Sequence, residues 1–166
     1  GTVVNITSGA SAGVTLNLNA ASALGTLAQV NLSSGSVINL GAAQTLASLS
    51  GAGNVTGAFV LTVGNANSAT VQNTNYSGAL GFGGAVTGLT KAGLGTLTLS
   101  GPNAYTGATI VSGGILKLNH ASALGATTGV TINTVGAVDL NGQTTNRNFI
   151  GINGTGVSSG GAIINS

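Results

Sequence analysis

Residues 95–119 read GTLTLSGPNAYTGATIVSGGILKLN, and this stretch decides the fold. Leucine alternates with threonine in its first part, and Lys117 separates Leu116 from Leu118 in its last part. Successive side chains of a β-strand point to opposite faces, so we predict that Leu97, Leu99 and the later leucines point inward while Lys117 faces water. Glycine, serine and asparagine bound each run, which indicates short strands joined by tight turns.

The same pattern continues along the chain. The block AASALG at 20–25 returns as HASALG at 120–125, which suggests equivalent positions. Apolar i, i+2 pairs recur about every 17 to 24 residues, within the range of solenoid repeats. We therefore predict an all-β protein, a parallel β-helix (β-solenoid) of about seven to eight turns, formed by one segment over residues 1–166. The pairs are Leu16/Leu18, Ile38/Leu40, Leu61/Val63, Leu80/Phe82, Leu97/Leu99, Leu116/Leu118, Val138/Leu140 and Ala162/Ile164.

An antiparallel β-sandwich is the competing architecture, because it also has many short strands with frequent turns. A sandwich of this size ordinarily fills its middle with large aromatic side chains, whereas aromatic residues make up 3% of this chain. The repeat spacing and the many small residues also favour the solenoid.

Composition restricts the possible functions. Charged residues make up 2% of the chain, and the net charge is only +2. The three cations Lys91, Lys117 and Arg147 are far apart in the sequence, so we expect no nucleic-acid binding. No uninterrupted apolar run reaches the roughly 20 residues of a membrane helix, so we expect no transmembrane segment in this chain. Without cysteine there is no disulfide framework.

Residues 75–125 resemble a known repeat. The motifs LTKAGLGTLTLSG, NAYTG and GGILKLN are similar to the autotransporter-associated β-strand repeat, found in passenger regions of bacterial type V secretion proteins. This resemblance implies a right-handed parallel β-helix that is secreted and lies on the bacterial surface or is released from it. Residues 1–74 would then be degenerate repeat turns and residues 126–166 further turns. We expect the chain to be part of, or processed from, a longer one.

The sequence offers little catalytic chemistry. Paired-acid hydrolysis needs two carboxylates, and Asp139 is the only acidic side chain. We interpret Asp139 as an outward-facing strand residue and His120 as a solvent-facing corner residue, because Ala20 takes its place in the other copy. One acidic residue cannot supply the oxygen ligands of a calcium site. We predict no enzyme activity, no catalytic residue, no cofactor and no metal site.

Three residues are candidates for surface contacts. Tyr76 and Tyr105 each precede a hydroxyl residue and glycine. We favour packed corner aromatics, with a sugar or partner contact as the alternative, because tyrosine combines an apolar ring with a polar tip. Lys91 lies in the repeat motif, where we favour a solvated turn residue over a lateral contact or cross-link.

The surface suggests the function. We see no amphipathic capping helix near TVVNIT or GGAIINS, and a nearly uncharged surface provides little repulsion between copies. We therefore expect end-to-end self-association through exposed β-edges, and a structural or adhesive extracellular role as a stalk, fibre or matrix subunit. The alternative is a passenger adhesin that binds glycans or a host surface.

Overall fold

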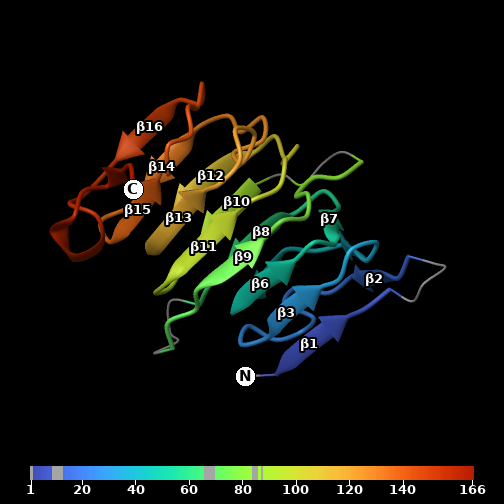
Figure 1. Ribbon diagram of the computed structural model, residues 1–166. Coiled ribbons are helices and arrows are strands. Elements are labelled where there is room, and N and C mark those ends of the chain that lie inside the picture. The colour runs from blue at the N-terminus through green and yellow to red at the C-terminus, as the bar shows by residue number, and fades with distance from the viewer. Residues whose placement is uncertain (1, 9–12, 66–69, 84–85, 87) are drawn as a thin grey trace.

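The computed structural model describes residues 2–8, 13–65, 70–83, 86 and 88–166. Three sheets of parallel strands form a coil, and its rungs follow one another from the N-terminus to the C-terminus in Figure 1. Every strand pairing in the described residues is parallel, so the β-solenoid is confirmed and the antiparallel sandwich is wrong. The right-handed sense of the coil and the subdivision at residues 74 and 125 stay predictions.

The strands divide among the sheets in a regular order. Within the part of the chain that the structure describes, the first rung has strands only in the eight-stranded and three-stranded sheets, and the next two rungs visit the eight-stranded, three-stranded and six-stranded sheets in turn. Later rungs have loops in place of the three-stranded sheet. The eight-stranded sheet contains β1 (Val3–Ile6), β3 (Gln29–Leu32), β6 (Ser48–Gly51), β9 (Thr74–Tyr76), β11 (Thr96–Leu99), β13 (Gly114–Leu118), β15 (Gly136–Asp139) and β17 (Ile163–Ile164). The six-stranded sheet contains β5 (Gln44–Leu46), β8 (Val60–Val63), β10 (Gly88–Lys91), β12 (Ala108–Val111), β14 (Val130–Ile132) and β16 (Phe149–Ile152). The three-stranded sheet contains β2 (Thr15–Leu18), β4 (Val37–Leu40) and β7 (Asn54–Thr56), and a short 3₁₀ helix spans Val157–Ser159.

The rungs differ in length. Asn31 pairs with Asn5, 26 residues earlier, and with Ser50, 19 residues later. The coil has about seven rungs. Across the sheets, register partners lie between 17 residues apart (Gln44 and Leu61) and 28 residues apart (Leu61 and Leu89). This range is wider than the predicted spacing of about 17 to 24 residues, because the strands keep their register while the corners absorb the extra residues.

The core is a set of aliphatic columns inside the coil. Leu97 pairs with Leu116 and Leu99 with Leu118, and all four side chains are buried as the alternation predicted. The predicted pair Leu80/Phe82 is an exception: Leu80 is buried, but Phe82 lies in a turn and is 55% exposed. Side chains alternate between the two faces only within a strand. Phe82 lies beyond the strand, so the alternation does not predict the direction of its side chain.

The predicted equivalence of residues 20–25 and 120–125 holds for the local turn but not for its place in the coil. Both blocks are turns that follow a strand. The preceding strand is β2 of the three-stranded sheet in one case and β13 of the eight-stranded sheet in the other. Ala20 and His120 therefore occupy different corners, because the short motif specifies a turn and not its position around the coil.

Close approach of neighbouring rungs explains one of the glycines. Gly64 has a φ of 95°, a backbone conformation that residues with a side chain rarely adopt. A Cβ atom at this position would also lie 1.7 Å from the carbonyl oxygen of Ala92 on the next rung. Only glycine fits this corner.

Candidate functional site

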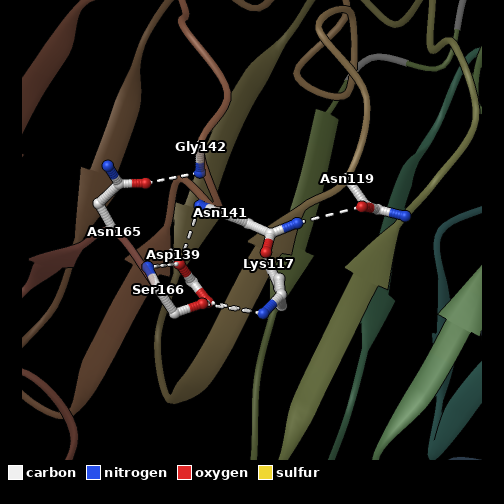
Figure 2. A network of polar contacts seen from close by, with 7 residues as sticks. All are labelled: Lys117, Asn119, Asp139, Asn141, Gly142, Asn165 and Ser166. Carbon is white, nitrogen blue, oxygen red and sulfur yellow. Dashed lines mark hydrogen bonds and ion pairs between the residues drawn. The ribbon is translucent and has the colours of Figure 1, made fainter.

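A polar network crosses the last rungs of the eight-stranded sheet (Figure 2). Lys117 on β13 and Asp139 on β15 are register partners, with Nζ 3.2 Å from Oδ2. Ser166 donates its backbone N–H to Oδ1 at 3.0 Å and its hydroxyl to Oδ2 at 2.7 Å. The N–H of Asn141 donates to Oδ1 at 2.9 Å. The network therefore joins three successive rungs.

Asp139 faces outward, as its pairing with the partly exposed Lys117 indicates, yet the residue is only 4% exposed. The segment ending at Ser166 covers it. Burial raises the pKa of the carboxyl, but hydrogen bonds from Ser166 and Asn141 and the contact with Lys117 outweigh burial and leave the pKa below its ordinary value. The sequence missed this cover, because Ser166 lies 27 residues further along the chain.

A ladder of asparagine and serine side chains runs along the coil beside this network. Ser100 donates its hydroxyl to Asn75 at 2.6 Å and accepts a hydrogen bond from Asn119 at 3.1 Å. Asn141 donates to Asn119 at 3.0 Å. Each bond connects adjacent rungs, so these polar residues have a structural role.

Lys91 lies inside the coil, so both of its predicted roles, as a solvated turn residue and as a surface contact, are wrong. It is 2% exposed and occupies an inward column between its register partners Val63 and Val111. Its amine donates to the carbonyl oxygens of Ala92, Gly93 and Gly113 at 2.8, 3.1 and 3.1 Å. Burial lowers the pKa of the amine to about 8. The sequence did contain an indication of this burial. Lys91 follows Leu89 by two residues, so alternation places both side chains on the inward face of the strand.

The two tyrosines are fully buried at 0% exposure. Their favoured interpretation as packed corner residues agrees with this burial, and the alternative of surface contacts through Tyr76 and Tyr105 is wrong. Tyr76 donates its hydroxyl to Gly53 at 2.7 Å, while the Tyr105 and Thr109 hydroxyls lie 2.7 Å apart. Burial raises the pKa of both phenols, so they stay protonated and serve as anchored core residues.

His120 and Asp139 do not form a catalytic pair. His120 is partly exposed at the start of the turn that follows β13, and its Nδ1 accepts the N–H of Ser122 at 3.0 Å. The partners of the Asp139 carboxylate are Lys117, Asn141 and Ser166. In the described part of the chain, no group of acidic, histidine or cysteine side chains could hold a metal ion.

A hollow lies between two corner segments. Its volume is about 460 Å³, and the turn 121–125 and the loop 144–147 line it. Arg147 is one of the lining residues and is partly buried. Sequence reasoning missed this hollow, since its two walls belong to successive rungs. The lining residues are Ala121, Ser122, Leu124, Gly125, Thr144, Thr145, Asn146 and Arg147.

With this geometry in view, residues 89–118 match the passenger-associated-transport-repeat family. The match begins in β10 and ends in β13, so it covers two strands from each of the two larger sheets. These residues carry the motifs from which the resemblance was drawn. The expected autotransporter passenger repeat is confirmed.

A particular relative agrees with this class. The chain is 35% identical over 98 residues, or 51% of its length, to a protein of Brucella suis biovar 1 (strain 1330) described as adhesin BmaC autotransporter. The match spans 3% of the length of that adhesin. Together with the repeat, it indicates a secreted protein that is surface-exposed or extracellular, as expected.

No solved structure matches this chain. Within the described ranges, no helix has the length and apolar character needed to cross a membrane.

Proposed function

We propose that this chain is a structural and adhesive segment of an extracellular autotransporter passenger. The observation that carries the proposal is the match of β10 to β13 to the passenger repeat within a continuous parallel coil. The similarity to an autotransporter adhesin supports the adhesive part. Buried aliphatic columns and bonded polar ladders suit a rigid element that displays its corners to the surroundings.

Adhesion can be tested with the purified chain on beads. We expect coated beads to attach to host-cell monolayers more than beads coated with an unrelated β-solenoid of similar charge. Attachment equal to that control would contradict the adhesive role. Electron microscopy of the same sample tests the structural role, since we expect elongated particles and not spheres.

We further propose a non-enzymatic role. The one carboxylate is held by Lys117, Asn141 and Ser166, and the Nδ1 atom of His120 is bonded to its own turn. General acid–base catalysis needs such groups within reach of a substrate. Turnover of a panel of polysaccharides and esters would contradict this proposal.

Self-association through the ends of the coil is a separate proposal. Ile152 ends an inward column, above its buried register partner Ile132, and is 52% exposed. An apolar column that stops at an exposed isoleucine suits continuation by another rung, in the same chain or from a second copy. A glycan- or host-binding passenger remains the alternative to a purely structural fibre.

Light scattering over a range of protein concentrations tests this association. We expect filaments or oligomers whose size increases with protein concentration. Ile152→Lys should weaken this association. Leu94→Lys is the matched control. Leu94 is similarly exposed, at 57%, but it lies in the turn between β10 and β11, midway along the coil and away from its ends. Monomers at every concentration would contradict self-association.

A further inference from the structure

The hollow between residues 121–125 and 144–147 has the size of a small-molecule site. Its volume of about 460 Å³ falls within the roughly 300–1,000 Å³ of ligand pockets. We propose that this hollow binds a carboxylate-bearing sugar, with Arg147 as the residue that recognises the carboxylate. The proposal deepens the adhesive function proposed above and rests on it for its biological meaning.

The charge of Arg147 provides the first argument. The sequence contains one side-chain carboxylate, on Asp139, and this group is paired with Lys117. Among the described residues, the guanidinium of Arg147 has no hydrogen-bond or ion-pair partner, although the residue is partly buried. A guanidinium has five donors in a planar fork that matches a carboxylate, so an acidic ligand would satisfy donors that the protein leaves open.

The remaining polar lining provides the second argument. Ser122 and Thr144 supply hydroxyl groups, and Asn146 supplies an amide, all three on exposed residues. Hydroxyl and amide groups both donate and accept hydrogen bonds, as the hydroxyls of a sugar do. The backbone of Arg147 is itself held, because its N–H donates to the hydroxyl of Thr145 at 3.2 Å. The cation therefore sits on an anchored loop among groups suited to a sugar ring.

Other anionic ligands fit this hollow less well. Polyanions such as nucleic acids are bound by many cations, and this chain has three, of which Lys91 is buried and Lys117 is paired. An extended peptide uses a free strand edge or apolar pockets. The walls of the hollow come from a turn and a loop, and Leu124 is their single large apolar side chain. An acidic sugar matches one cation surrounded by hydroxyls.

Saturation-transfer NMR with the purified chain can test the proposal at millimolar ligand. Glucuronic acid and glucose form a matched pair, because the carboxylate replaces one hydroxymethyl group on the same ring. We expect transfer to glucuronic acid and affinity about tenfold or more weaker for glucose, the size of effect that a hydrogen bond to a charged group supplies. An acidic peptide is a further probe, and inorganic phosphate, which has no carbon-bound protons to observe, is tested by its ability to displace glucuronic acid.

Two variants connect the signal to the hollow. Arg147→Gln should weaken glucuronic acid binding about tenfold or more while leaving glucose unchanged. Asn146→Ala changes an exposed lining residue and should weaken the binding of both sugars. This variant tests the hollow if Arg147→Gln does not fold. Thr15→Ala is the control, since Thr15 is exposed on β2 in the first rung, and it should bind as the parent does.

The outcomes separate this inference from the proposed function. Absence of binding by any acidic sugar, equal binding of glucose, stronger binding of phosphate or the peptide, or unchanged binding by Arg147→Gln would each overturn the sugar site. If sugar binding is absent but coated beads still attach to cells, only the sugar site is overturned. If sugar binds but the beads do not attach, the adhesive function is overturned.

Discussion

Lys117 and Asp139 face one another across adjacent strands of the same sheet, and the chain end at Ser166 closes over the pair with two hydrogen bonds to the carboxylate. The ionised form of Asp139 therefore holds the last rungs together. This arrangement explains why a carboxylate that faces outward is nearly inaccessible, and it gives the molecule a defined response to acid.

We predict that stability falls as the pH drops below about 4. The pKa of Asp139 is lowered in the folded protein, so its contribution is complete above the ordinary pKa and is lost as the pH falls through the folded value. Asp139→Asn should remove this part of the acid dependence and cost about 1–2 kcal/mol at neutral pH. Urea unfolding at several pH values measures both effects, and an unchanged acid limb in Asp139→Asn would contradict the assignment.

Lys91 should make the protein more stable as the pH rises from about 8 to 10. Its folded pKa is about 8, below the value of 10.5 for a free lysine, so in this window the unfolded chain binds more protons than the folded one. We expect a gain of about 2 kcal/mol across the window. Above pH 10 the buried tyrosines reverse the trend, because their raised pKa values favour ionisation of the unfolded chain. Lys91→Met should flatten the curve between pH 8 and 10, and a parent-like rise in that variant would contradict this account.

Leu99 and Leu94 provide a matched pair for the core. Leu99 is 0% exposed in β11, whereas Leu94 is 57% exposed in the preceding turn. Leu99→Ala should lower the free energy of unfolding by about 2–5 kcal/mol, because it leaves a cavity in an aliphatic column. Leu94→Ala should change it by less than about 0.5 kcal/mol. Similar losses in both variants, measured by denaturant unfolding, would show that the columns do not carry the stability.

Substitutions at Gly64 and Gly25 distinguish the cost of backbone strain from the cost of a clash between neighbouring rungs. Both have positive φ, 95° and 80°, but a Cβ at Gly64 would meet the Ala92 carbonyl while a Cβ at Gly25 would meet no atom within 4 Å. Gly25→Ala should cost about 1–2 kcal/mol from conformation alone. Gly64→Ala should cost more or prevent folding. Equal thermal midpoints for the two variants would contradict the close contact between rungs.

The sequence was sufficient for the strands and their parallel stacking, because both depend on local alternation and a regular spacing. Leu97, Leu99, Leu116 and Leu118 all lie where alternation placed them. Features built from two rungs could not be predicted. The burial of Lys91 depends partly on the carbonyl of Gly113, 22 residues away, and the cover over Asp139 depends on Ser166. The hollow beside Arg147 lies between the corners that follow β13 and β15, which belong to different rungs.

The unequal length of the rungs has an evolutionary consequence. Strand register is kept whether 19 or 26 residues separate paired positions, so the coil tolerates insertions at its corners without disturbing the columns. Duplication of a rung could lengthen such a protein, and corner residues could then diverge one copy at a time. A recognition loop such as 144–147 could arise in one repeat while the neighbouring repeats continue to supply the strands and aliphatic columns that stabilise the coil.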